Sequence, residues 1–286
     1  MNEKQLAGKT YAVIGLARAG APAARFLAER GARVFGYDSR TLEELSDEAR
    51  ALAASGVLLH TGTHKFAGLE ECDTVVLSPG LKIHHEPLRS VLAQRAAGGA
   101  EVIGELELAA RHCPAPIIAV TGTKGKSTTV KLITDILQAC GVNARRAGNT
   151  GIPLIAELSN LSPDSWAVVE VSSFQLERAP TLKPRIAVLL NLLADHLDYH
   201  PTLEQYWTTK LKLFANQDEA DIAIFNVDDD CVAGMMNEGG NALRGWLAGL
   251  RAHIVQSSAR DVALAEVPLR GAHNHSNLAA AVAAVT

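Results

Sequence analysis

The stretch TGTKGKSTT, residues 121–129, has the residue types of a loop that surrounds phosphate groups. It follows the apolar run IIAV and opens a helical pattern, so we expect a strand, a loop and a helix in that order. In such a unit the backbone N–H groups of the loop and of the helix N-terminus face the phosphates. The standard pattern G-x-x-x-x-G-K-[ST] would need glycine where Val120 stands, so this loop is a shorter form. The alternative, a glycine-rich turn with a solvated lysine, does not explain the strand and helix on either side.

Three side chains near this loop suggest metal and phosphate chemistry. Lys126 can neutralise the β and γ oxygens of a nucleotide, and Ser127 can hold Mg²⁺. Glu170 lies inside the apolar run WAVVEVSS, where an unpaired buried carboxylate is costly. Either Glu170 reaches solvent at the end of its strand, or it serves a metal, because ligands of open α/β sheets bind at the carboxyl ends of the strands.

A histidine follows the next apolar run. RIAVLLN ends in Asn191 and leads to LADHLDYH, which contains His196. A lone histidine is most often structural, but one beside a phosphate loop and Glu170 is better explained as a ligand of a second metal ion. Because Mg²⁺ prefers oxygen ligands, this histidine would need an anionic partner nearby.

Lys210 occupies an unexpected position in a helix that we predict over residues 201–217. On a helical wheel of about 100° per residue, Lys212 points to solvent and Lys210 falls within the apolar face. That face comprises Leu203, Tyr206, Trp207, Leu213 and Phe214. A lysine in apolar surroundings has a lowered pKa, and its neutral amine can add CO₂ to become a carbamate anion. The alternative is that the side chain extends its ammonium group to the surface.

Alternating strand-like and helical runs must position these side chains. TYAVIG, APAARFLAERG and RVFGYD begin a βαβ pattern that continues through DTVVLSPG, so we expect parallel sheets covered by helices. The chain of 286 residues is long for one domain, and CPAP near residue 113 resembles a linker. We therefore expect two α/β domains, a Rossmann-like domain over residues 1–112 and a P-loop-type domain over 113–286. The chain stops within an Ala-rich helical pattern, which suggests a fragment.

The first domain carries GLARAG, residues 15–20, where a dinucleotide-binding fingerprint would lie. Ala17 replaces the second glycine of G-x-G-x-x-G, the residue that lets backbone approach a pyrophosphate, so NAD is disfavoured. Asp38 ends the next strand, as an acid that contacts a ribose or base would. A plain βαβ turn with a capping aspartate is the alternative.

Composition excludes several classes of protein. The net charge is −4 and no basic stripe is present, so we expect no nucleic-acid partner. No apolar run approaches the ~20 residues that span a bilayer, so we expect no membrane insertion. The four cysteines are far apart and form no CxxC, as in proteins of a reducing cytoplasm, where we expect this chain to be.

Together these motifs resemble the Mur ligases, the ATP-dependent amide-forming enzymes of peptidoglycan synthesis. The order TGTKGKST, GNTGIP, VEVSSFQLE, NLLADHLDYH, KLKLF, GAHNHSN is that of the family, and the resemblance covers essentially the whole chain. SSFQLE, with DSR after the second strand, is most similar to the member that adds D-glutamate to UDP-N-acetylmuramoyl-L-alanine.

The resemblance implies a role for each matching residue, with ATP, two Mg²⁺ sites and a carbamate on Lys210. The ATP site would comprise Gly122, Thr123, Lys124, Gly125, Lys126, Ser127, Thr128, Asn274 and Asn277. The catalytic residues would be Lys126, Glu170, His196 and Lys210, and the metal ligands Ser127, Glu170, His196 and Lys210. The UDP-sugar substrate would contact Leu16, Ala17, Asp38, Ser39, Arg40, Gly80, Asn149, Ser172 and His196.

The family reaction activates a carboxylate as an acyl phosphate, which the amine of D-glutamate then attacks. In the family a third, C-terminal Rossmann-like domain of ~100–150 residues binds D-glutamate, and we expect that domain to be missing here. The fragment alone should then turn over weakly or not at all, and we expect a monomer. The alternatives are another Mur ligase, an enzyme like folylpolyglutamate synthase, or a non-catalytic nucleotide-binding module.

Overall fold

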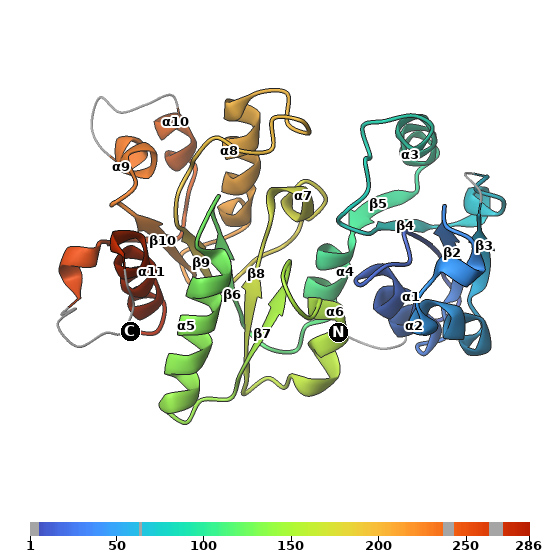
Figure 1. Ribbon diagram of the computed structural model, residues 1–286, viewed down its shortest axis with the longest axis horizontal. Helices are drawn as coiled ribbons and strands as arrows, with labels where there is room; N and C mark the ends of the chain where they lie inside the picture. Colours follow the sequence, from blue (N-terminus) through green and yellow to red (C-terminus); the bar gives the residue numbers. More distant parts are fainter. Residues whose placement is uncertain (1–5, 63–64, 237–242, 263–270) are drawn as a thin grey trace. The chain divides into compact units, whose positions relative to one another are not determined.

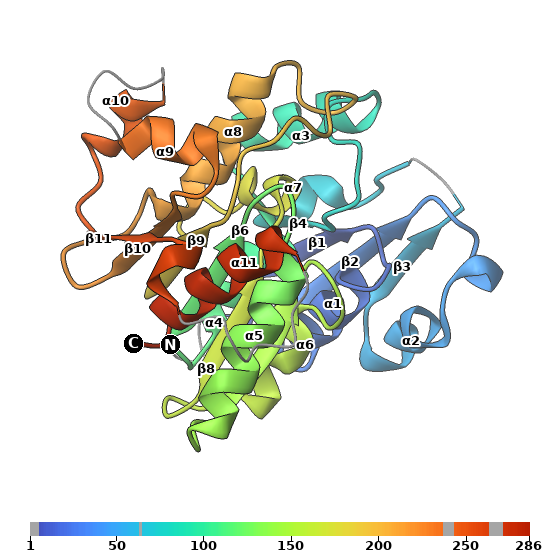
Figure 2. The same ribbon diagram turned by 60° about the vertical axis from the view of Figure 1, so that its left-hand side comes forward.

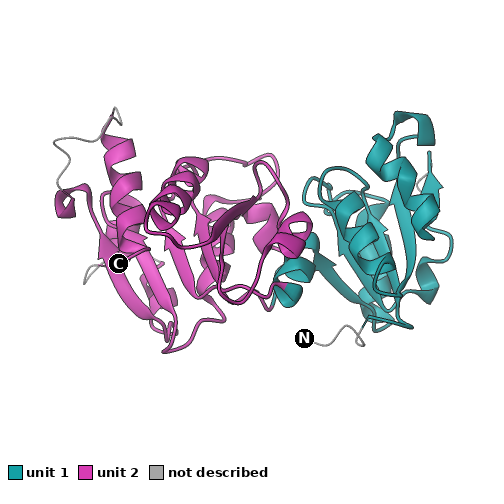
Figure 3. Cartoon of the chain, turned by 90° about the horizontal axis from the view of Figure 1, so that it is seen from below, with its two compact units in different colours: residues 1–112, 178–180 teal, residues 113–177, 181–286 magenta. Residues whose placement is uncertain are grey.

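The chain divides into two compact units in this computed structural model (Figure 3). Residues 6–62, 65–236, 243–262 and 271–286 are described; residues 1–5 of the polar amino-terminal stretch lie outside them. Unit 1 comprises residues 1–112 and 178–180, and unit 2 residues 113–177 and 181–286. Each unit contains a parallel sheet with helices, so the predicted α/β class is confirmed.

The described part of unit 1 forms a five-stranded sheet in the order β3-β2-β1-β4-β5 (Figure 1). All of its strand pairs are parallel. The chain moves outward from β1 to β3 and returns to the other side of β1, so the strand order reverses between β1 and β4. The strands are β1 (Thr10–Ile14), β2 (Arg33–Asp38), β3 (Leu58–Thr61), β4 (Thr74–Leu77) and β5 (Glu101–Gly104). The helices are α1 (Gly20–Ala28), α2 (Asp47–Arg50), α3 (Leu88–Ala97) and α4 (Glu105–His112).

The turn from β1 into α1 depends on its glycines. Gly15 has a φ of 84°, a left-handed conformation that glycine adopts without strain. A Cβ atom at Gly20 would lie 1.8 Å from the carbonyl oxygen of Gly15. Only a residue without a side chain therefore lets α1 begin this close to β1.

The described part of unit 2 forms a six-stranded parallel sheet in the order β11-β10-β9-β6-β8-β7. The central strand β6 lies between β8 and β9, and the direction of winding changes there. The strands are β6 (Ile117–Thr121), β7 (Ala144–Gly148), β8 (Trp166–Glu170), β9 (Ile186–Leu189), β10 (Ile222–Asn226) and β11 (His253–Ser257). The helices are α5 (Lys126–Ala139), α6 (Leu154–Glu157), α7 (Ser173–Leu176), α8 (Leu203–Leu211), α9 (Asp230–Met236), α10 (Arg244–Leu247) and α11 (Ala272–Ala283).

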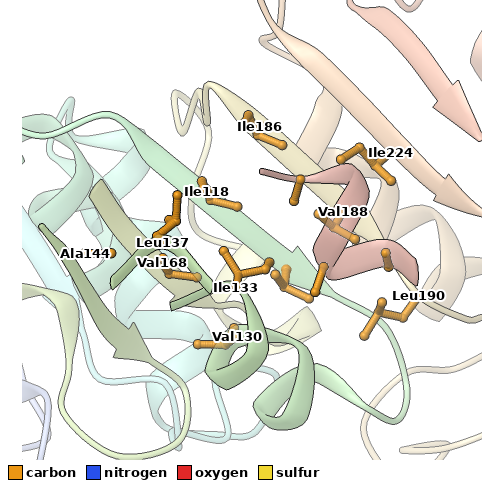
Figure 4. Close-up of a cluster of buried hydrophobic side chains, with 14 residues drawn as sticks. Ile118, Val130, Ile133, Leu137, Ala144, Val168, Ile186, Val188, Leu190 and Ile224 are labelled. Atoms are coloured by element: carbon orange, nitrogen blue, oxygen red, sulfur yellow. The ribbon is translucent and has the colours of Figure 1, made fainter. Parts of the chain in front are cut away.

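The core of unit 2 lies between its sheet and two helices. Helices α5 and α11 lie side by side (Figures 1 and 2). Ile133 of α5 and Ala280 of α11 pack with Val120, Val168 and other aliphatic side chains of the strands (Figure 4). Strands buried on both faces read as continuous apolar runs, which is why β6 has the sequence IIAVT. This packing fixes the amino end of α5 at the carboxyl end of β6.

Within the residues that the structure describes, every helix is too short or too polar to cross a bilayer.

Candidate active site

The phosphate-type loop lies between the end of β6 and the start of α5. Gly125 precedes the helix with a φ of 86°, and a Cβ atom there would come within 2.4 Å of Asn277 Oδ1. Lys126 folds back over the loop, its Nζ donating to the carbonyl oxygens of Gly122, at 2.9 Å, and Thr123, at 3.0 Å. Burial lowers the pKa of Lys126, and the charge of Lys124 adds to this against the opposing effect of Glu170. The predicted strand, loop and helix are confirmed.

Ser127 and Glu170 meet at the start of α5. Ser127 Oγ donates to Glu170 Oε2 at 2.7 Å, and the residue Glu170 is only 3% exposed. The other oxygen, Oε1, accepts hydrogen bonds from Thr150 Oγ1 at 2.8 Å and Asn149 Nδ2 at 3.1 Å. The buried carboxylate is therefore satisfied by three donors and does not reach solvent. A hydroxyl beside a carboxylate is a donor set of oxygen atoms, which fits Mg²⁺.

Lys210 is buried, with 1% of the residue exposed, so it does not extend its ammonium group to the surface. Its Nζ donates to the carbonyl oxygen of Gly122 at 3.0 Å and lies 4.4 Å from the ring centroid of Tyr206. Burial, with the nearby charge of Lys126, lowers the pKa of Lys210 to about 7. A large share of the lysine is then a neutral amine near neutral pH, which fits the chemistry of CO₂ addition.

Helix α8, which carries Lys210, is shorter than predicted. It ends at Leu211 and continues as a 3₁₀ turn over Lys212–Phe214, whereas we expected helix through residue 217. Lys212 is exposed, as predicted.

His196, like Lys210, lies near the ring of Tyr206. It is the one described non-glycine residue with a positive φ, 52°, and its side chain is 44% exposed. Its ring centroid lies 5.9 Å from that of Tyr206 and 5.0 Å from that of Phe174. In the described part of the chain no three His, Cys, Asp or Glu side chains gather as a metal site. A metal at His196 would therefore need further ligands besides His, Cys, Asp and Glu side chains, such as a carbamate or substrate oxygen.

A cavity of about 480 Å³ opens beside the loop in unit 2. Lys124, Asn191, Asp228 and Asn277 are among the residues that line it. Asn274 is not among the lining residues, but its Oδ1 accepts a hydrogen bond from Asn277 Nδ2 at 3.3 Å. The two asparagines predicted to contact a nucleotide are thus close together, with Asn277 facing the cavity.

Unit 1 has its own cavity, of about 520 Å³, at the carboxyl ends of β1 and β4. Parallel sheets bind ligands at such points of reversal. Its lining includes five of the six residues predicted for this unit, Ala17, Asp38, Ser39, Arg40 and Gly80. The sixth, Leu16, has a buried side chain and does not line the cavity. Its backbone N–H donates to Asp38 Oδ2 at 2.8 Å and so helps to hold that lining residue.

Asp38 organises the unit 1 cavity. Arg40 donates to both of its oxygens from the side chain, at 2.9 and 2.8 Å, and from its backbone N–H at 3.0 Å. Burial opposes ionisation of Asp38, but the hydrogen bonds from Arg40 and Leu16 outweigh it and lower the pKa. The carboxylate is therefore charged and fixed in place.

Ser172 is engaged locally. Its Oγ accepts from the backbone N–H of Gln175 at 3.4 Å and lies 3.0 Å from Gln175 Oε1, in a capping box at the start of α7. Its hydroxyl therefore stabilises the helix after Glu170. Thr128, the last residue of the predicted loop set, is half-buried in the first turn of α5.

Two polar residues with clear partners in this site received no role from the sequence. Thr150 bonds Glu170, and Asn191 bonds the loop through Thr123 and Lys124. Thr150 directly follows Asn149 in GNTGIP, and Asn191 ends an apolar run. These places in the sequence were the only features that could have indicated a role for either residue.

Comparison with known proteins identifies the same regions. Residues 120–285 match the family model of the Mur ligase middle domain, and residues 9–104 that of the Mur ligase MurD-like N-terminal domain. A protein of Pelotomaculum thermopropionicum named UDP-N-acetylmuramoylalanine–D-glutamate ligase is 40% identical over 301 residues, covering 98% of this chain and 64% of that protein. A protein of the same name from Geobacter metallireducens is 43% identical over 231 residues, covering 81% of this chain and 50% of that protein. The chain thus spans between half and two thirds of these relatives.

Solved structures agree in fold. The murein peptide ligase of Psychrobacter arcticus has a TM-score of 0.58 and 18% identity, covering 97% of this chain and 65% of that one. UDP-N-acetylmuramate:L-alanyl-γ-D-glutamyl-meso-diaminopimelate ligase from Neisseria meningitides also has a TM-score of 0.58, with 19% identity, and covers 97% and 93%. The family models match both units, and the first of them alone matches more than half of the chain: this chain belongs to the Mur ligase family.

Proposed function

We propose that this chain is part of an ATP-dependent ligase that joins D-glutamate to UDP-N-acetylmuramoyl-L-alanine. The single observation that carries the proposal is the buried Lys210 with a pKa of about 7, bonded to the carbonyl oxygen of Gly122 in the phosphate-type loop. Relatives that cover nearly the whole chain and bear the name UDP-N-acetylmuramoylalanine–D-glutamate ligase support the choice of substrates.

The nucleotide would bind in unit 2. The first turn of α5 offers backbone N–H groups without intrahelical acceptors, and Lys126 lies folded over the loop, ready to turn to the phosphates. Asn277 lines the cavity beside the loop, where the rest of the nucleotide would lie. The proposed nucleotide site also includes Gly122, Thr123, Lys124, Gly125, Ser127, Thr128 and Asn274.

Ser127 and Glu170 would hold one Mg²⁺, and His196 with a carbamylated Lys210 a second. Bound Mg²⁺ supplies electrostatic stabilisation of the charge that develops in phosphoryl transfer. Three donors orient Glu170 before any ligand arrives. CO₂ addition requires the neutral amine of Lys210; the new N–C bond forms as an N–H proton is released to solvent, and the product is a carbamate anion.

The UDP end of the substrate would bind in the unit 1 cavity, and its muramoyl-alanine end would contact Asn149, Ser172 and His196. Asp38 presents a fixed charge, held by Arg40 and by the backbone N–H of Leu16. Ala17, Ser39 and Gly80 line the same cavity. The relative from Pelotomaculum thermopropionicum matches 98% of this chain, and the match spans 64% of the relative. We therefore propose that D-glutamate is bound by a part of the ligase that corresponds to the remaining third of that relative. We also propose that the protein is a monomer and that it lies in the cytoplasm.

The test is ADP release by residues 1–286 together with any continuation that the gene encodes. The mixture contains ATP, Mg²⁺, bicarbonate and UDP-N-acetylmuramoyl-L-alanine, with D-glutamate or another amino acid as acceptor. Release that depends on D-glutamate supports the proposal, and release with another acceptor only points to a different Mur ligase. Nucleotide binding without release for any acceptor would favour the non-catalytic module. Replacing the UDP-sugar by a folate as the carboxylate substrate separates the folylpolyglutamate synthase alternative.

A further inference from the structure

Asn191 holds the phosphate-type loop by its side chain. It lies two residues beyond the end of β9 at Leu189. Its Oδ1 accepts hydrogen bonds from the backbone N–H groups of Thr123 and Lys124, both at 2.9 Å. Its Nδ2 donates to the carbonyl oxygen of Lys124 at 3.0 Å. One side-chain amide therefore bonds three backbone groups of a segment that belongs to neither the strand nor the helix; the Thr123 N–H is shared with the backbone carbonyl oxygen of Asn191, at 3.2 Å.

The place of Asn191 in the fold explains how it can do this. Strands β6 and β9 pair in parallel, with Thr121 opposite Leu189, so the loop after β6 and the segment after β9 leave the sheet together. Gly122 allows their close approach, because a Cβ atom there would lie 3.0 Å from Leu190 Cβ and 3.3 Å from the backbone nitrogen of Asn191. The anchor is thus a side chain at a rigid strand end.

The contact continues toward His196. Thr123 Oγ1 accepts from the backbone N–H of Leu193 at 3.0 Å, and Lys124 Nζ pairs with Asp195 at 3.3 Å. The two segments are therefore joined at three successive points, the last of them next to His196. A shift of the loop would be transmitted to the segment that carries the histidine.

We infer that Asn191 is a positioning residue for nucleotide phosphates, replacing contacts that a longer loop would make within itself. The loop is shorter than the standard pattern, and Asn191 occupies the N–H groups of Thr123 and Lys124. The phosphates are then left to the free N–H groups at the start of α5. The identity of the ligand rests on the proposed function; the hydrogen bonds that fix the loop do not.

The test compares Asn191→Ala and Asn191→Asp with the unchanged full chain by calorimetry with AMP, ADP and ATP, each with Mg²⁺. For Asn191→Ala we expect a loss of tenfold or more in affinity for ADP and ATP, and a smaller loss for AMP, because the loop contacts the outer phosphates. In the ligation assay the KM for ATP should rise by a similar factor, while the KM for the UDP-sugar stays unchanged.

Asn191→Asp separates positioning from a general loss of stability. Its carboxylate still accepts both N–H bonds, but it loses the bond that Nδ2 donates to the carbonyl oxygen of Lys124 and places a negative charge beside the phosphates. We therefore expect weak ATP binding at low salt and a return toward the unchanged chain as salt screens the repulsion, relative to the same series for the unchanged chain. Asn191→Ala should show no such recovery. If Asn191→Ala does not fold, this salt series still decides the matter.

Asn216→Ala is the matched control, because Asn216 donates to a backbone carbonyl, that of Leu182, elsewhere in unit 2. It should bind ATP within twofold of the unchanged chain. Equal losses for AMP, ADP and ATP, an equal loss in Asn216→Ala, or no salt recovery in Asn191→Asp would overturn the inference. Ligation that fails with every acceptor while the phosphate-dependent losses persist would reject the proposed function and leave the role of Asn191 standing.

Discussion

The two units place different charged groups near the points where the strand order of their sheets reverses; unit 2 adds two lysines to a buried carboxylate, that of Glu170. In unit 1 the reversal beside β1 holds the buried carboxylate of Asp38, fixed by Arg40 and by a backbone N–H. In unit 2 the reversal beside β6 holds Lys126 and Lys210, whose ammonium groups share the carbonyl oxygen of Gly122. The topology therefore determines where a ligand would bind, and the side chains at the strand ends would determine which ligand it is.

Lys126→Met should have the largest effect, because in the proposed function it removes the charge that would face the transferred phosphate. We expect ligation to fall about 10³-fold, with the affinity of unit 1 for the UDP-sugar unchanged. ADP release and calorimetry measure the two quantities. Lys131→Met is the control, since Lys131 lies on the same helix and pairs with Asp135 in solvent. An equal loss of UDP-sugar affinity would show that the two sites are not independent.

Lys210→Met tests the second lysine, with opposite effects on activity and stability. Ligation should fall about 10²-fold or more, because the variant would remove a ligand of the proposed second metal site. In CO₂-free buffer the free energy of unfolding should rise by about 1–4 kcal/mol, because methionine fills the site without a buried charge.

The stability gain in Lys210→Met should depend on pH. The folded pKa of Lys210, about 7, lies below the ordinary value of 10.5, so the unfolded chain binds the proton more tightly. The unchanged chain therefore loses stability as pH falls from 10.5 to about 7, and below that the loss is complete. Denaturant unfolding should show the largest gain at pH 6 and a shrinking gain above pH 7. A gain that is constant from pH 6 to 10 would contradict the lowered pKa.

Asp38→Asn tests the charge in unit 1. An amide cannot accept from Leu16 and Arg40 as the carboxylate does, and unsatisfied donors cost about 1–3 kcal/mol, so UDP-sugar affinity should fall about 10- to 100-fold. ATP affinity should stay unchanged. The folded pKa of Asp38 is lowered, so the carboxylate adds to the free energy of unfolding at pH values above the ordinary aspartate pKa. That contribution is lost as the pH falls below the ordinary aspartate pKa.

Asp73→Asn is the matched control for Asp38, since Asp73 accepts a backbone N–H of unit 1, that of Thr10. UDP-sugar binding by this variant should match that of the unchanged chain. A similar loss in both variants would mean that the charge of Asp38 has no special role.

Local patterns in the sequence predicted most of the fold. Apolar runs such as IIAV became strands, and the glycine-rich stretch after it became the loop before α5. The wheel placed Lys210 on the apolar face of its helix, but could not decide between burial and extension to solvent. That choice depends on Tyr206 and on the loop at Gly122, which cover the ammonium group from two sides.

The contacts that the sequence did not predict join segments far apart in the chain. Asn191 bonds a loop 67 positions earlier, and Thr150 donates to a carboxylate 20 positions later. Neither residue type is unusual at the end of an apolar run or in a glycine-rich turn. Their roles follow from the order of the strands, which brings β6, β8 and β9 together, and a pattern along one chain does not contain that order.

Thr150→Val should have the smallest effect and tests how finely unit 2 orients its carboxylate. Valine keeps the shape of threonine but removes the hydroxyl that donates to Glu170 Oε1, while Asn149 and Ser127 still donate to the carboxylate. Loss of one such bond is worth about 0.5–1.5 kcal/mol, so the Mg²⁺ concentration for half-maximal ligation should rise about two- to tenfold.

The control for Thr150→Val is Thr208→Val, which removes a hydroxyl bonded to the backbone of α8 and should leave the Mg²⁺ requirement unchanged. A Mg²⁺ titration of ADP release measures both variants. If Thr150→Val matched the unchanged chain, two donors would suffice to orient Glu170. Unit 2 would then depend on its lysines far more than on its carboxylate, and the contrast with the acid-centred site of unit 1 would be sharper.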